Sequence, residues 1–170
     1  VWRVKRFLRG VLSNDLPGRH LKMVGFFSED DKPTLYSDAF RQRLNASIGE
    51  ALRYIRSAFA ACEGEDFVNR MLAVDFKTYL PECLMAKVDV ATMACSLEGR
   101  SPLLDHVFVE TAFRMSGDWK LKGLRGHKYI MKEAFKDLLP EEILNRPKMG
   151  FGIPLGAWFR GGIKNFWEEN

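Results

Sequence analysis

The sequence has few cysteines and no long apolar run. Its 170 residues include three cysteines, Cys62, Cys83 and Cys95, which are too few and too scattered for a disulfide framework or a zinc site. This usage is typical of a reducing compartment, so we expect a cytoplasmic protein with buried thiols. No stretch reaches the roughly 18 uncharged apolar residues that a membrane span requires, and basic side chains interrupt the first ten residues. We therefore expect neither a membrane span nor a secretory signal.

Strand signals and phosphate-binding loops are also scarce. No stretch alternates cleanly between apolar and polar side chains with β-branched enrichment. A strand followed by a glycine-rich loop and a helix, the usual cradle for a nucleotide phosphate, is absent. His20, His106 and His127 lack a metal-type partner four residues away, so we expect solvated or capping histidines and no metal site. These absences favour a mainly α chain.

The overall composition is that of an ordinary globular protein. Hydrophobic residues make up 46% of the chain and charged residues 28%, which excludes intrinsic disorder and collagen. The net charge of +4 is modest. It permits an anionic small-molecule ligand, and we expect no nucleic-acid partner.

Residues 1–78 predict helices joined by short turns. A turn cluster covers 14–18 and a polar, exposed loop covers 28–33. One helix is predicted from residue 38 towards residue 60, and the acidic turn 63–66 ends it. The helical pattern then resumes over 67–81. The apolar face of the first of these helices consists of Phe40, Leu44, Ile48, Leu52, Ile55 and Phe59.

The segment 79–99 predicts a further helix. Pro81 suits the first turn of this helix, and Gly99 suits a left-handed cap at its end. Apolar side chains recur every three or four residues and predict a buried stripe. The stripe consists of Leu84, Val88, Ala91 and Cys95, whereas Lys87 and Asp89 lie off it.

Charged residues follow the predicted end of this helix. If the backbone is extended there, Glu98 and Arg100 point the same way and can pair. The pair either braces the turn or holds a guanidinium towards an anion, and the bracing role is favoured. Ser101 and Pro102 are suited to begin the next helix, over 103–115. Asp105 is expected to cap or charge its first turn, in a structural rather than a chemical role.

A second feature lies at 145–154. Pro147 holds Arg146 in an extended conformation, and Gly150 allows a ligand to approach the backbone closely. Lys148 between them presents a point charge suited to phosphate oxygens, although composition alone favours an ordinary basic surface loop.

Other basic and aromatic residues receive simpler predictions. The run of lysines and arginines over 120–132, around Gly123 and Gly126, is expected to form a solvated face rather than a phosphate contact. The tryptophans Trp119, Trp158 and Trp167 are expected to pack in the core.

These motifs together resemble a known family. The run 87–106, KVDVATMACSLEGRSPLLDH, resembles the synthetase domain of glutamine-hydrolysing asparagine synthetases. So do 127–129 leading into a helix, LLP at 138–140 and RPKMGFGIPL at 146–155. The order and spacing match over 79–160, whereas 1–78 resembles the variable middle of that domain. The sequence is also similar to amidotransferases associated with exosortase and exopolysaccharide genes.

The resemblance implies a fold and an activity. It implies an ATP pyrophosphatase domain of α/β type that uses ATP and Mg²⁺, adenylates the side-chain carboxylate of aspartate, and lets glutamine-derived ammonia displace AMP to give asparagine. Lys148 would contact the ATP phosphates and the leaving pyrophosphate, with Arg146 and Gly150 beside it. Behind these we expect Glu98, Arg100, Asp89 and Asp105 to support the site.

The sequence also departs from the family pattern. The phosphate-binding Ser-Gly-Gly-x-Asp-Ser loop, the Gly-Glu-Gly-x-Asp-Glu segment and the N-terminal glutaminase cysteine are absent from residues 1–170. We therefore expect one partial domain, the helical C-terminal portion of the α/β domain without most of its parallel sheet, which is inactive alone, binds no cofactor by itself and self-associates or dimerises. The alternatives are an amidotransferase or lactam-forming synthetase that acts on another acid, and a non-catalytic helical interaction module.

Overall fold

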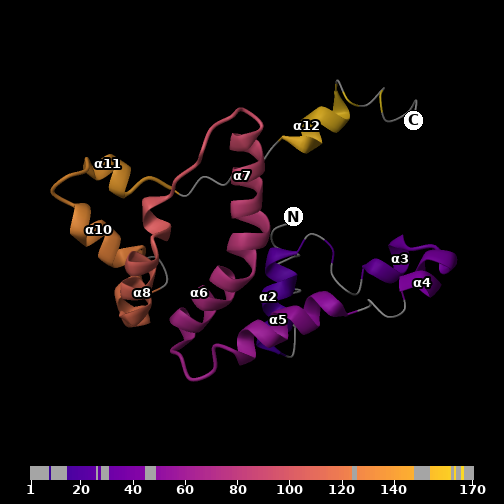
Figure 1. The fold of residues 1–170 in the computed structure, drawn as a ribbon, viewed down its shortest axis with the longest axis horizontal. Helices are drawn as coiled ribbons and strands as arrows, with labels where there is room; N and C mark the ends of the chain where they lie inside the picture. The colour runs from indigo at the N-terminus through magenta and orange to yellow at the C-terminus, as the bar shows by residue number, and fades with distance from the viewer. Residues whose placement is uncertain are drawn as a thin grey trace. The chain divides into compact units, whose positions relative to one another are not determined.

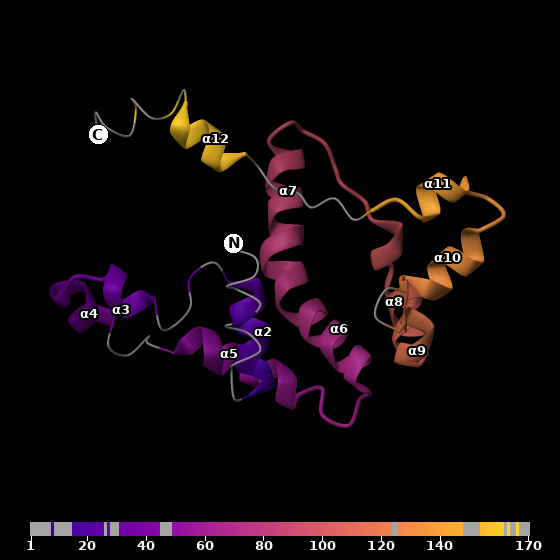
Figure 2. The same cartoon turned by 180° about the vertical axis from the view of Figure 1, so that it is seen from behind.

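The structure is a computed structural model, and the described residues are mostly helical (Figures 1 and 2). It describes residue 8, residues 15–25, residue 27, residues 31–44, 49–123, 126–147 and 154–161, and residues 163 and 166. The chain divides into two compact units, Val1–Ile130 and Met131–Asn170. The mainly α prediction is confirmed, whereas the parallel sheet of the larger domain stays a prediction.

The first unit begins with short helices and one longer pair. Its elements in chain order are α2 (Leu16–Val24), α3 (Lys32–Leu35), α4 (Asp38–Leu44), α5 (Glu50–Ala60), α6 (Phe67–Lys77), the π-helix η1 (Leu80–Met85), α7 (Ala86–Met93), the 3₁₀ turn η2 (Pro102–Leu104), α8 (His106–Arg114), α9 (Gly117–Lys120), β1 (Leu121–Lys122) and β2 (Gly126–His127). Helix α10 (Tyr129–Phe135) crosses into the second unit, which also contains α11 (Glu141–Leu144) and α12 (Leu155–Arg160).

The core of the first unit lies where α5 packs against α2 and α6. Phe59 and Val74 are its most deeply buried large side chains. The buried apolar residues of this core are Ile55, Ala58, Phe59, Cys62 and Val74, and Leu16, Leu21, Met71 and Ala73 pack against them. Amphipathic faces on three helices thus bury one another, as their periodicity requires.

Two local predictions about the first sixty residues are wrong. The predicted single helix over 38–60 is two helices, α4 and α5, because Gly49 adopts a left-handed φ of +83° before α5. The predicted turn at 14–18 contains the start of α2, with Pro17 in its first turn. Of the predicted loop at 28–33, residues 28–30 lie outside the described residues, and Lys32 begins α3.

The helix that follows begins where the pattern predicts, at Phe67, but α6 ends at Lys77 rather than near residue 81. Asp66 caps α6 by accepting a hydrogen bond from the Asn69 N–H at 2.9 Å, immediately after the predicted turn. Helix α6 then continues through η1 into α7 (Figures 1 and 2).

The buried stripe predicted for 79–99 is wrong. Val88, Ala91 and Cys95 are exposed, and no residue of η1 or α7 is buried within the described part of the chain. The helix also ends earlier than predicted, at Met93, and the left-handed residue after it is Ser96 rather than Gly99. Apolar periodicity indicates a face that can be buried, but burial also needs an element that packs on it.

Several predictions about single side chains are also wrong. Cys83 and Cys95 are exposed thiols, and only Cys62 among the three is buried. Trp119 and Trp158 are about half exposed, with 54% and 44% of their surface accessible, and Trp167 lies outside the described residues.

A short hairpin was not predicted. Strands β1 and β2 pair antiparallel, with Leu121 opposite His127 and Lys122 opposite Gly126. A Cβ on Gly126 would lie 2.2 Å from the Lys122 carbonyl oxygen, so the close pairing requires glycine there. Two-residue strands carry too little alternation to be seen in the sequence.

Candidate functional site

The predicted pair of Glu98 and Arg100 is present. The Arg100 Nε donates to Glu98 Oε1 at 2.9 Å, on the segment without regular secondary structure that follows α7. Both side chains are largely solvent-exposed, at 83% for Arg100 and 71% for Glu98. An exposed pair of this kind contributes about 0–1 kcal/mol to stability, so it orients the guanidinium more than it stabilises the fold.

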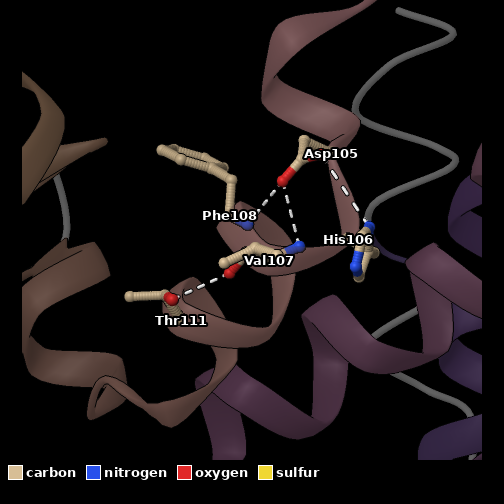
Figure 3. Close-up of polar contacts among 5 residues, drawn as sticks. All are labelled: Asp105, His106, Val107, Phe108 and Thr111. Carbon is tan, nitrogen blue, oxygen red and sulfur yellow. Dashed lines mark hydrogen bonds and ion pairs between the residues drawn. The ribbon is translucent and has the colours of Figure 1, made fainter.

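Asp105 caps helix α8 (Figure 3). Its Oδ1 accepts hydrogen bonds from the N–H groups of Val107, at 3.0 Å, and Phe108, at 3.2 Å. The other carboxylate oxygen lies 3.8 Å from His106 Nδ1. Within the first turns, the Thr111 hydroxyl donates to the Val107 carbonyl oxygen at 2.7 Å.

This geometry confirms a capping contact for Asp105 and corrects the predicted helix start. Ser101 precedes only the short turn η2, and its side chain makes no capping hydrogen bond. The α-helix starts at His106 because the Asp105 carboxylate satisfies two amides that the helix itself leaves without partners.

Of the remaining predicted site residues, the structure describes Asp89 and Arg146. Asp89 lies exposed in the first turn of α7, and its carbonyl oxygen accepts from the Thr92 hydroxyl at 3.2 Å. Arg146 is exposed after α11 in the second unit. Lys148 and Gly150 lie outside the described residues. The chemistry predicted for the loop at 145–154 is therefore untested by the structure.

A polar cluster that the sequence did not predict joins α6 to α9. Asp66 Oδ2 accepts from the Asn69 side-chain amide at 2.8 Å and from the Gly117 N–H at 3.1 Å. The same Asn69 amide donates to the Met115 carbonyl oxygen at 3.0 Å, and the Lys120 ammonium donates to Asn69 Oδ1. Asn69 is buried with all of these partners, so the cluster fixes α6 against the chain some fifty residues later.

The surroundings in this cluster change the pKa values of Asp66 and Lys120. Hydrogen bonds from the Asn69 and Gly117 amides, with a smaller part from the Lys120 charge, lower the pKa of Asp66. Burial lowers the pKa of Lys120, while Asp66 and Glu65 oppose that change. The prediction of a fully solvated basic face over 120–132 is thus wrong for Lys120, whose ammonium also lies 5.1 Å from the centre of the Phe113 ring.

A second unpredicted pair lies in the core. His20 is only 4% exposed, and its Nε2 lies 3.4 Å from Asp75 Oδ1. Its ring packs edge-on against Phe59, with ring centres 5.6 Å apart. Burial lowers the pKa of His20 while the Asp75 charge raises it, and burial raises the pKa of Asp75. The prediction of a solvated or capping histidine is wrong here, whereas His106 is exposed.

Neither a metal centre nor a membrane helix is found in the described parts of the chain. Across 15–25, 31–44, 49–123 and the later described ranges, no three His, Cys, Asp or Glu side chains come close enough to hold a metal ion. Among those same residues, none of the helices is long and apolar enough to cross a membrane.

Comparisons with known proteins identify the family. The asparagine synthase family model matches residues 3–170, which includes the part that the motifs alone did not assign. Asparagine synthetase 1 (glutamine-hydrolyzing) of Bacillus subtilis is 30% identical over 139 residues, covering 80% of this chain and 22% of the relative. A putative asparagine synthetase (glutamine-hydrolyzing) of Mycobacterium tuberculosis is 36% identical over 104 residues, covering 61% and 16%. The enzyme of that name from Mus musculus is 33% identical over 116 residues, covering 67% and 19%.

These matches define the extent of the similarity. The chain spans about a fifth of the length of the curated relatives it matches. No solved structure matches it. Because the family model covers nearly every residue, the chain belongs to the asparagine synthase family.

Proposed function

We propose that this chain is part of a cytoplasmic, ATP-dependent amide-forming ligase of the asparagine synthetase type. The observation that carries the proposal is the family match over 3–170, together with relatives named glutamine-hydrolyzing asparagine synthetases. The motifs at 87–106 and 146–155 lie inside the matched region. The complete protein would act on aspartate, with ammonia supplied by a glutaminase domain outside this chain.

The proposed reaction has two steps. An oxygen of the aspartate side-chain carboxylate attacks the α-phosphorus of ATP, and the bond to pyrophosphate breaks. Ammonia then attacks the carbonyl carbon of the aspartyl adenylate, loses a proton, and displaces AMP to leave asparagine. Negative charge therefore builds on the departing pyrophosphate in the first step, where a fixed cation has its largest effect.

Lys148 is the residue that we assign to this charge. Pro147 before it restricts the backbone, and Gly150 and Gly152 after it permit close contact with a ligand. A lysine held in this way stabilises the leaving pyrophosphate without having to reorganise. We assign Arg146 and the amide of Gly150 to the same phosphate groups.

We assign the other predicted residues a supporting role in the site. Asp105 caps α8 through its Oδ1, and Glu98 orients Arg100. Asp89 would belong to the same support. The phosphate-binding Ser-Gly-Gly-x-Asp-Ser loop of the family is absent from residues 1–170, so we place most of the ATP pocket outside this chain. On this view the 170 residues are one partial domain without activity of its own.

The test is Lys148→Ala in the complete protein. We expect asparagine formation from aspartate, ATP and ammonia to fall by about two orders of magnitude or more, because one preorganised electrostatic contact contributes a factor of about 10²–10³. Glutamine hydrolysis should stay largely intact. The matched control is Lys136→Ala, which removes an exposed lysine of the second unit whose Nζ lies 3.6 Å from Glu133 Oε2. Equal synthesis rates in the two variants would remove Lys148 from the mechanism.

The exposed apolar surface favours a second candidate, a helical interaction module. On and after α7, large apolar side chains are exposed, namely Val88, Val90, Met93 and Leu97. Such a surface supports contacts with another protein segment or a second copy. Concentration-dependent dimers in light scattering, from a complete protein that makes no amide, would favour the module over the enzyme.

A further inference from the structure

An aromatic pair, Trp119 and Tyr129, lies beside the hairpin formed by β1 and β2. Helix α9 carries Trp119, and β1 and β2 return the chain so that Tyr129 lies next to it. The two rings stack with centres 6.3 Å apart and planes 24° apart. The positioning depends on tight backbone geometry, because Gly126 has no room for a Cβ and Lys128 adopts a left-handed φ of +57°.

A lysine ammonium group contacts one ring of this aromatic pair. Lys122 Nζ lies 4.3 Å from the centre of the Tyr129 ring and donates to the Tyr129 hydroxyl at 3.1 Å. These contacts hold the Lys122 ammonium on the Tyr129 ring, which itself stacks on Trp119. The ammonium group and the two aromatic rings therefore lie together beside the hairpin.

These groups surround a hollow of about 430 Å³. Its lining consists of Asp118, Trp119, Leu121, Lys122, Gly123 and Tyr129. Trp119 keeps 54% of its surface accessible. An exposed indole beside a fixed ammonium is the combination by which proteins hold a base and its phosphate.

We propose that this hollow binds a nucleotide, with the base stacked on Trp119 and the phosphate on Lys122. The Asp118 carboxylate would accept hydrogen bonds from ribose hydroxyls or a ring amino group. The same carboxylate repels additional negative charge, so the site favours a monophosphate over a triphosphate. This site is separate from the triphosphate contact assigned to Lys148 and does not depend on the proposed reaction.

Calorimetric titration of the 170-residue chain with AMP tests this site. Trp119→Ala should weaken AMP binding by about tenfold or more, because stacking on one aromatic ring contributes about 1–3 kcal/mol per base. Lys122→Gln should weaken AMP about fivefold or more and bring its affinity close to that of adenosine. ATP should bind no more tightly than AMP, and inorganic phosphate should bind much more weakly than either.

Two matched variants serve as controls. Trp158→Ala removes a tryptophan of similar exposure from α12, and Lys136→Gln removes an exposed lysine. Both should bind AMP as the unchanged chain does. Circular dichroism checks that Trp119→Ala still folds, and Lys122→Gln keeps the test decisive if it does not.

The outcomes separate the possibilities. Loss of AMP binding in both site variants but in neither control supports the site. A thymidine octamer that binds at least tenfold more tightly than AMP, with the same dependence on Trp119 and Lys122, supports it with a nucleic-acid strand as the source of the nucleotide. No binding of AMP, equal binding in the variants, or preference for ATP overturns the proposal.

Discussion

Two stretches of the first unit differ sharply in how they are packed. In the stretch formed by α2, α5 and α6, Phe59 and Val74 are fully buried and a histidine lies among them. In the stretch formed by η1 and α7, no described residue is buried, although apolar residues are frequent. The first stretch has low sequence specificity for the family, whereas the second carries its most recognisable motif.

The difference teaches that recognisable sequence and buried core are separate properties. Helix α7 leaves its large apolar side chains, Val88, Val90 and Met93, exposed to solvent. Stability of this chain should accordingly depend on the first stretch and hardly on the second.

The largest contrast is expected between two matched valines. Val74→Ala in the core should lower the free energy of unfolding by about 2–3 kcal/mol, because two buried methyl groups and their packing are lost. Val88→Ala in α7, where the side chain is 43% exposed, should change it by less than about 0.5 kcal/mol. Urea unfolding of the two variants measures both values. Equal losses would mean that α7 is packed in this chain.

Alanine substitutions at two glycines give a second comparison of a closely packed region with the exposed segment after α7. A Cβ on Gly117 would lie 2.4 Å from Asp66 Oδ1 and 2.6 Å from Val68 Cβ, so Gly117→Ala should separate α9 from α6 and lower the free energy of unfolding by about 1–2 kcal/mol. On Gly99, after α7, a Cβ would meet nothing nearer than 3.6 Å. Gly99→Ala should therefore be neutral within about 0.5 kcal/mol. Thermal unfolding distinguishes the two variants, and a neutral Gly117→Ala would contradict the close packing.

The free energy of unfolding should also depend on pH, through the buried His20. Burial lowers the pKa of His20 below the usual 6.5. Just below that pH, the histidine therefore binds a proton in the unfolded chain but not in the folded chain. The free energy of unfolding should fall as the pH drops through 6.5 towards the folded pKa. Asp75 acts in the opposite sense above 3.8, because burial raises its pKa.

The His20 contribution is isolated by comparing unfolding curves at several pH values. His20→Gln should flatten the decline below pH 6.5, whereas His106→Gln, which alters an exposed side chain, should leave it unchanged. An identical pH profile in His20→Gln and the unchanged chain would show that the buried ring does not resist protonation.

The smallest effect is expected for the exposed pair after α7. Arg100→Ala removes its ion pair with Glu98 and should change the free energy of unfolding of this chain by less than about 0.5 kcal/mol. In the complete protein the same variant should slow amide formation by more than that stability change explains. A loss of stability of 2 kcal/mol in the isolated chain would make the pair a structural brace instead.

Local features of the chain could be predicted from the sequence, and distant contacts could not. The Asp105 cap and the Glu98–Arg100 pair each depend on residues two or three positions apart. The contact of Lys120 with Asn69 joins residues 51 positions apart, and no local pattern indicates it. The buried stripe on α7 failed for a related reason, because periodicity does not reveal whether a covering element is present.

The candidate site divides in the same way. The family could be identified because several motifs occur in a fixed order, and the family match confirms it. The roles of Lys148 and Gly150 remain predictions from that resemblance. Asp105 could be predicted as a cap from its place before an apolar run, whereas the burial of His20 depends on the way α2 lies against α5 and α6.

The most direct test of the account is the stoichiometry of the complete protein supplied with ATP, aspartate and ammonia. The account predicts that pyrophosphate, AMP and asparagine appear one for one, and that no pyrophosphate accumulates without aspartate. Release of ADP and phosphate, or turnover that is indifferent to aspartate, would contradict it.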